Sequence, residues 1–409
     1  MRRVLPPSIA LCLVVVWSVP GFAQQRLAEA EAVARLSLES PRARAARAEV
    51  EVARADALAA GRLSNPQLTL SRESVAGVAE NFLLVSQALP VWGRRGLQLE
   101  SAAQQVRASE LRTDDLLRRL RGEVRRAFVD LSVEEARERE LDEALKSLRS
   151  LAEALARRER AGDAAGFDRL RAEREALDVA AALGDARARR GRAQGVLASF
   201  FFPVPDPSTL HASPLSPEHG PLPTAEELVR RAEGSRPDLQ ALEREIEAAR
   251  LAGRAAARSV LPEPEVVAGL KTSSVGNDRR GSVVSLLASV PLFDRARPER
   301  AQASARERLA TARRDALRAE IAGSVRGLLI AAHERRRAAD EYRREAVPRS
   351  DDLRRIAQVS YDEGERGILE LLDAYRSAAD ARLRLLDLDA ASAHVDIDLE
   401  FASAMEIRK

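Results

Sequence analysis

One turn from a strand-like segment into a long helix occurs twice in this sequence, and the repeat constrains the fold more than any other feature. Residues 81–96 run from an apolar, strand-like stretch through a proline and an aromatic residue into a helical pattern. Residues 282–297 repeat this order 201 positions later. The match predicts an internal duplication with two equivalent strand-to-helix junctions, marked by Pro90 and Trp92 in the first copy and by Pro291 and Phe293 in the second.

Long helical runs follow both junctions. No proline occurs between Trp92 and Arg160, and at 1.5 Å per residue such a helix is roughly 100 Å long. Apolar residues recur along it at intervals of three and four, a spacing typical of coiled-coil seams. The residues expected in these seams are Leu117, Leu120, Val124, Ala127, Leu131, Leu141, Leu145, Leu148, Ala152 and Leu155.

The repeat and the turn signals divide the chain into four parts. In each half we expect a helix, a β-hairpin, a long helix, a tight turn and a returning helix. We expect a loop of several residues in the first hairpin and an interruption at Pro348 in the second long helix. The parts are a signal peptide (1–23), a first repeat (24–202, hairpin about 65–90), a Pro-rich linker (203–223) and a second repeat (224–409, hairpin about 262–291).

The first 23 residues have the pattern of an export signal. Two arginines precede the apolar run Ile9–Val19, and Gly21, Phe22 and Ala23 form a small-x-small cleavage site. Eleven apolar residues are too few to span a bilayer, which takes about 20. The only cysteine, Cys12, lies in this segment. We therefore expect an exported protein whose mature form has no thiol chemistry and no disulfides.

The charge balance argues against a nucleic-acid partner. Removing Arg2 and Arg3 from the 66 basic residues leaves 64 against 63 acidic residues, a net charge of +1. The charges alternate along the chain and form no basic block. Aromatic residues make up only 3% of the sequence, whereas 32% is charged. This composition favours extended helices packed side by side over a large globular core.

Four strands are too few to close a barrel, and an open sheet in an exported protein would have exposed edges. Three copies of the chain would supply twelve strands, an even number that closes. Their alternating faces suit lipid outside and water inside. The predicted fold is therefore mainly α with a small membrane β part, in which a trimeric twelve-stranded β-barrel continues into an α-helical barrel.

The sequence resembles a known family, the TolC-like outer-membrane factors of tripartite efflux and type I secretion systems. The resemblance covers essentially the whole mature chain. It rests on the two junctions and on the segment from Tyr361 to Ala374 (YDEGERGILELLDA). Asn65–Leu68 (NPQL), followed by Ser86-Gln87 and Gly93-Arg94-Arg95, is most similar to the branch that serves heavy-metal RND pumps.

The resemblance implies a homotrimer in the outer membrane of a Gram-negative bacterium, extending into the periplasm. It implies a passive exit duct that is gated by helices at its periplasmic end. In the heavy-metal branch, this duct would carry metal cations. The implied partners are a periplasmic adaptor (membrane fusion) protein, an inner-membrane RND-type pump and outer-membrane lipid. A drug-efflux or type I secretion channel is the alternative within the family, and no cofactor is implied.

The resemblance also assigns site residues. The periplasmic gate is expected at Asp168, Tyr361 and Arg366, where Asp168 would bind Arg366 or Tyr361 and hold the tunnel shut. Glu370 and Asp373 lie one helical turn apart and would form an acidic constriction ring in a trimer. Glu370 stands where the family usually has aspartate. Without the resemblance, the same carboxylates are typical of a solvated helix face.

Other classes of protein find little support. The sequence has no phosphate-binding glycine loop, no nucleophile elbow and no plausible Ser/His/Asp set, so we do not expect an enzyme. The four histidines have no metal-ligand spacing, which leaves no candidate metal site. A periplasmic coiled-coil adaptor is the more serious rival. It would have one helical hairpin flanked by small β-domains, whereas two strand pairs are predicted here between long helices.

Overall fold

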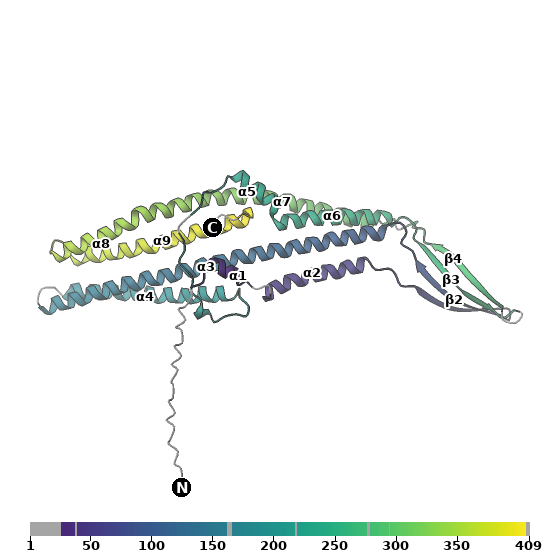
Figure 1. The fold of residues 1–409 in the computed structure, drawn as a ribbon, viewed down its shortest axis with the longest axis horizontal. Helices are drawn as coiled ribbons and strands as arrows, with labels where there is room; N and C mark the ends of the chain where they lie inside the picture. The colour runs from purple at the N-terminus through teal and green to yellow at the C-terminus, as the bar shows by residue number, and fades with distance from the viewer. Residues whose placement is uncertain are drawn as a thin grey trace, which may run out of the picture.

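The computed structural model describes residues 26–36, 39–161, 166–216, 219–275, 279–293 and 295–405. The molecule is elongated, with paired long helices at one end and a small sheet at the other (Figure 1). The expected signal peptide lies outside the described residues. The mainly helical fold with a small antiparallel sheet is confirmed.

The order of elements is similar in the two halves. In the first half the elements are α1 (Glu29–Ala34), α2 (Pro41–Ala60), β1 (Gln67–Val75), β2 (Val78–Ala88), α3 (Arg94–Ala161) and α4 (Gly166–Ala198). A 3₁₀ turn, η1 (Pro207–Thr209), lies between the halves. The second half contains α5 (Ala225–Ser235), α6 (Pro237–Arg258), β3 (Pro264–Ser273), β4 (Arg279–Ala288), α7 (Arg297–Glu341), η2 (Tyr342–Ala346), α8 (Val347–Asp362) and α9 (Ile368–Ser403).

Helix α3 has 68 residues, which makes it roughly 100 Å long. All of its predicted seam residues except the half-buried Leu117 are buried: Leu131 is fully buried and Leu155 is 1% exposed. Near the far end of the helices, the seam joins side chains of α4, α8 and α9 in one apolar cluster. This cluster holds the two helical pairs together and thereby positions the turns at their ends.

Local signals explain several helix boundaries. The Ser40 hydroxyl accepts a hydrogen bond from the amide of Ala43 at 3.3 Å, and Thr224 caps α5 in the same way. Pro348 does not break the second long helix. Because proline lacks an amide hydrogen, the chain passes through the π-helical turn η2 just before it and then continues as α8.

The four strands form one antiparallel sheet in the order β1-β2-β3-β4. One cross-strand row pairs Leu70 with Leu83, Leu83 with Leu270, and Leu270 with Ser282. The loop of several residues expected in the first hairpin is wrong. Ala76 and Gly77 alone connect β1 to β2, both with positive φ, as in a type I′ turn. Ala-Gly lacks the Asn-Gly or Asp-Gly signal of this turn, so the sequence did not reveal it.

The Pro-rich segment between the halves is packed against the helices rather than free. Phe201 forms a β-bridge with Leu36, and Ala212 forms one with Leu27. Phe200, Phe201, Leu210 and Ala212 are all less than a tenth exposed and join the core beside α3. Residues 200–212 therefore pack against the first half of the chain.

None of the helices in the described part of the chain is long and apolar enough to cross a membrane.

Candidate functional site

The far end of the helices brings Asp168 and Tyr361 together. The Tyr361 hydroxyl donates a hydrogen bond to Asp168 Oδ2 at 2.9 Å. Asp168 lies in the first turn of α4, where the helix dipole favours a carboxylate, and Tyr361 lies in the last turn of α8. Tyr361 is only 8% exposed and packs in the apolar cluster shared by the two helical pairs. The bond therefore links α8 to α4 across two hairpins.

The turn after α8 is built around Gly364. Its φ of +77° is a conformation that few other residues adopt. The amide of Glu365 donates to the Ser360 carbonyl at 2.9 Å, and the amide of Gly364 donates to the Tyr361 carbonyl at 3.1 Å. This pair of bonds is the Schellman motif that commonly ends helices. The glycine thus stops α8 directly after Tyr361 and holds the tyrosine in the final turn.

The surroundings of Tyr361 keep its hydroxyl protonated. Burial, followed by the hydrogen bond to the Asp168 carboxylate, raises the pKa of Tyr361 to about 12. Arg158 lies over the ring at 5.7 Å and opposes this shift. The hydroxyl is therefore a hydrogen-bond donor throughout the physiological pH range, and the bond to Asp168 is charge-assisted.

The other predicted site residues lie at the same end but remain apart. Arg366 is exposed, and within the described residues its side chain makes no hydrogen bond or ion pair. Of the two partners expected for Asp168, the structure pairs it with Tyr361. Glu370 and Asp373 are exposed on α9. Glu370 occupies the first turn of that helix, where a carboxylate also stabilises the helix dipole.

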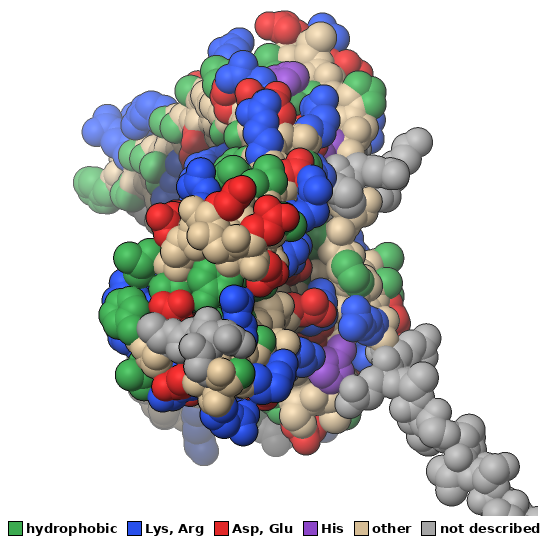
Figure 2. Space-filling model, turned by 90° about the vertical axis from the view of Figure 1, so that its left-hand side faces the viewer, with side chains coloured by type: hydrophobic (Ala, Val, Ile, Leu, Met, Phe, Trp, Pro, Cys, Tyr) green, Lys and Arg blue, Asp and Glu red, His purple; other side chains and the backbone are tan. Residues whose placement is uncertain are grey.

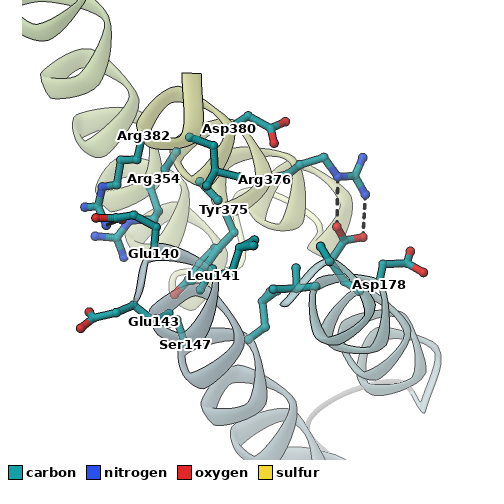
Figure 3. Close-up of a pocket in the computed structure, with 18 residues that line it drawn as sticks. Glu140, Leu141, Glu143, Ser147, Asp178, Arg354, Tyr375, Arg376, Asp380 and Arg382 are labelled. Carbon is teal, nitrogen blue, oxygen red and sulfur yellow. Dashed lines mark hydrogen bonds and ion pairs between the residues drawn. The ribbon is translucent and has the colours of Figure 1, made fainter. Parts of the chain in front are cut away.

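A cavity that sequence reasoning missed lies nearby. It has a volume of about 420 Å³ and lies between α3, α4, α8 and α9. Figure 3 shows Arg376 of α9 reaching across to the carboxylate of Glu175 on α4, with nitrogen–oxygen distances of 3.0 and 2.6 Å. Each of these side chains resembles many other charges in the sequence, so no local signal identifies the pair. It is a second link between the helical pairs.

Figure 2 looks onto this end of the molecule and shows hydrophobic, acidic and basic side chains intermixed. Across the described residues, no group of three or more His, Cys, Asp or Glu side chains has an arrangement that could hold a metal ion. Three of the four histidines, His211, His219 and His394, lie beside the carboxylates of Glu135, Asp396 and Asp130 at 2.9, 3.3 and 3.0 Å.

The junction residues lie where the sheet meets the helices. Trp92 Nε1 donates to the carbonyl of Pro262 at 2.8 Å, and Arg258 donates to the Trp92 carbonyl at 3.1 Å. The first junction is thus bonded to the second half of the chain. Phe293, its counterpart, is 97% exposed.

Comparison with known proteins relates the second half of the chain to a known family. Residues 228–403, which contain the second hairpin and the helices after it, match the family profile "Outer membrane efflux protein". The second half of the chain is therefore similar to outer membrane efflux proteins. Proteins of this family transport and do not catalyse a reaction. A search of curated proteins found no match.

Solved structures share the fold of this chain over almost its whole length. A membrane protein from Pseudomonas aeruginosa is 22% identical, with a TM-score of 0.76 and 92% of both chains covered. CusC is 17% identical, with a TM-score of 0.75, and 92% of this chain and 91% of CusC are covered. The MtrE outer membrane channel of Neisseria gonorrhoeae is 20% identical, with a TM-score of 0.74, and 93% and 89% are covered.

Proposed function

We propose that three copies of this chain form a passive channel that crosses the outer membrane and continues through the periplasm as a helical duct. In this proposal the chain consists of two repeats, 24–202 and 224–409, after a signal peptide. The observation that carries the proposal is the sheet, which has one mainly apolar face, one mixed face with most of its polar side chains, and two unpaired edges.

The strand register separates the two faces. One face contains Leu70, Leu83 and Leu270 in a single row, with Leu68, Val85, Ala268 and Val284 in the next row. Leu83, Val85 and Leu270 are 42%, 45% and 57% exposed, whereas Val267 on the opposite face is 8% exposed. The sheet is therefore curved with its apolar face on the convex side. A membrane barrel needs this arrangement, with lipid outside and a polar interior.

The concave face carries many polar side chains. Glu80 and Lys271 form an ion pair across it at 2.7 Å. Other polar side chains on this face are Gln67, Thr69, Ser71, Glu73, Ser86, Glu265, Arg279 and Ser285. Such a surface suits the wall of a water-filled passage.

The edges of the sheet are β1 and β4. Edge strands present unpaired amide and carbonyl groups, which a lipid environment does not satisfy. Pairing β4 of one copy with β1 of the next removes every edge, and three copies give the even strand number that such barrels have. The three-copy assembly is thus the arrangement that supplies these missing hydrogen bonds.

Exposed apolar side chains on the helices support the same assembly. Phe167, Leu170 and Leu177 on α4 are 57–70% exposed, a costly exposure for a protein that acts alone. Helices α7 and α8 expose a second set, Leu309, Ile330, Leu353, Ile356 and Val359. We propose that these two sets meet between neighbouring copies and that Pro90, Trp92, Pro291 and Phe293 mark the passage from barrel to duct.

For substrate and partners, we propose metal cations delivered by an inner-membrane RND-type pump through a periplasmic adaptor. The acidic pair Glu370 and Asp373 supports a cation preference, because three copies would place six carboxylates near the duct end. The resemblance of residues 65–68 and 86–95 supports the metal branch. Drug efflux is the alternative function. Experiments with the purified pump and adaptor would decide between metal efflux and drug efflux.

The channel proposal is tested by inserting purified protein into planar bilayers of phosphatidylcholine. We expect discrete conductance steps and, on gels, a trimer band that heat converts to monomer. Recovery as a soluble periplasmic monomer without conductance would contradict the proposal and favour a structural coiled-coil protein.

A gate prediction concerns the bond between Tyr361 and Asp168. Replacing Tyr361 by phenylalanine removes a charge-assisted bond of about 1.5–3 kcal/mol and should raise the open-to-closed ratio between about tenfold and about a hundredfold per subunit. Tyr375→Phe is the matched control, because the Tyr375 hydroxyl bonds to Gln358 inside the α8–α9 pair at 3.0 Å. Equal open probability in the two variants would show that the bond does not gate the channel.

The gate also has an expected pH dependence. Because the pKa of Tyr361 is raised to about 12 from the ordinary value of about 10, the bond contributes fully below pH 10 and is lost as pH passes 12. Open probability should therefore rise in that alkaline window in the wild type. The Tyr361→Phe variant should lack this titration.

Neutralising the acidic pair tests the constriction. In the Glu370→Gln/Asp373→Asn double variant, we expect severalfold weaker cation-over-anion permeability and weaker block by multivalent cations, because six carboxylate charges leave the duct end. Glu365→Gln is the control, since this exposed carboxylate lies in the turn between α8 and α9. Reversal potentials in a salt gradient measure the preference. Equal shifts in both variants would mean that only total charge matters.

A further inference from the structure

Two arginines lie on the convex apolar face of the sheet, beyond its apolar rows. Arg72 on β1 and Arg280 on β4 belong to one cross-strand row, which runs from Arg72 through Asn81 and Thr272 to Arg280. Arg72 shares a face with Leu70, and Arg280 shares that same face with Val284, because side chains two positions apart in a strand point the same way. Both arginines are exposed.

Their position along the strands is also defined. The hairpin ends point away from the helices (Figure 1). If the helices lie in the periplasm, as the proposed function has it, Arg72 and Arg280 lie toward the outer leaflet. A bare guanidinium is costly on the lipid face near the midplane and is tolerated at the interface, where it meets headgroups. Their place beyond the apolar rows matches that interface.

Neither arginine has a protein partner among the described residues. Three other cations of the sheet end are engaged: Lys271 pairs with Glu80 at 2.7 Å, and Arg258 donates to the carbonyl of Trp92 at 3.1 Å. Arg94 pairs with Glu263 at 3.6 Å. Arg72 and Arg280 thus present donors that no described residue engages.

Closure of the barrel would bring the two arginines close to one seam. They lie on the edge strands β1 and β4. In the proposed trimer, β4 of one copy pairs with β1 of the next. Each seam would then carry an Arg280 and an Arg72 from different subunits. Guanidinium groups bind phosphate oxygens through paired hydrogen bonds, which makes them well suited to phosphorylated headgroups.

We propose that Arg72 and Arg280 bind the phosphate groups of outer-leaflet lipid at the seams between subunits. The inference rests on the proposed trimeric channel. The bound lipid is a phosphorylated glycolipid, held by its headgroup while its acyl chains cover the apolar rows around Leu70 and Leu83.

Native mass spectrometry of the detergent-purified trimer tests this with diphosphoryl lipid A and the same lipid without phosphates as probes. In the Arg72→Gln/Arg280→Gln variant, we expect affinity for diphosphoryl lipid A to fall about fivefold for each arginine removed at a site. The dephosphorylated lipid should bind weakly to wild type and variant alike. Arg279→Gln is the matched control, because Arg279 carries the same charge one position away and faces the concave side.

Three results would overturn the proposal: unchanged affinity in the double variant, an equal loss in Arg279→Gln, or equal binding of the lipid without phosphates. Conductance in pure phosphatidylcholine separates this inference from the channel itself. Wild type and double variant should conduct alike there. A wild type that neither conducts nor forms trimers would refute the proposed function, whereas a conducting trimer with unselective lipid binding would refute only the lipid site.

Discussion

Replacing Asp396 by alanine is expected to destabilise the helical part of the protein by about 3–5 kcal/mol, the usual cost of leaving a buried charge without its partner. The Asp396 side chain is fully buried and lies 3.0 Å from Arg336, whose side chain is 9% exposed. Arg336 also donates to the Gly220 carbonyl at 2.7 Å. The pair therefore links α7, α9 and the segment that joins the two halves.

Asp398→Ala is the matched control for this prediction. Asp398 lies two residues further along α9 and pairs with Arg126, and both side chains are more than a third exposed. Such pairs contribute about 0–1 kcal/mol. The stability of both variants is measured by the loss of the helical circular-dichroism signal as guanidinium is added. Equal unfolding midpoints would show that the Arg336 charge is not buried in solution. Recovery of the midpoint in an Arg336→Met/Asp396→Leu variant would support the unpaired buried charge as the cause of the destabilisation.

Replacing Gly269 by valine should prevent assembly of the barrel. A Cβ at this position would lie 2.0 Å from the Leu83 carbonyl oxygen and 2.8 Å from the Leu84 Cα. Both atoms are backbone atoms of the paired strand β2, so no side chain can rotate away. The β2–β3 pairing at the centre of the sheet must open, which removes the link between the two hairpins.

Gly281→Val separates this contact from a general effect of removing glycine. Gly281 faces the same concave side from β4, and a Cβ there would meet nothing within 4 Å. We expect the Gly281 variant to yield heat-modifiable trimers in outer-membrane fractions at wild-type level and the Gly269 variant to yield almost none. Normal trimers from Gly269→Val would mean that the sheet is less tightly curved than described.

The spacing of apolar residues was enough to predict the long helices, because a helix that buries one face has apolar residues at regular intervals of three and four. Leu131 and Leu155 occupy such seam positions and are buried. The caps Ser40 and Thr224 are local in the same way, since each accepts a hydrogen bond from an amide three residues further on. Features of this kind are local, so the sequence alone reveals them.

Contacts between distant segments were less predictable. The sequence left two partners open for Asp168, and only the packing of α8 against α4 selects Tyr361. Arg336 lies within a run of three arginines, and nothing local marks it as the buried one. The sequence identified residues 203–223 only as a Pro-rich linker for the same reason, because the apolar side chains of this segment are buried by helices far away in sequence.

Cysteine crosslinking between β1 and β4 tests the central claim, that three copies close one barrel through their edge strands. Within a single chain β2 and β3 separate these strands, so at about 4.8 Å per strand step their Cα atoms lie too far apart for a disulfide. In a Cys12→Ser background, one cysteine in residues 67–75 and one in 279–288 would be scanned through register in outer membranes. We expect a covalent ladder that ends at the trimer, whereas monomers alone, or a ladder that continues beyond three, would contradict closure by three copies.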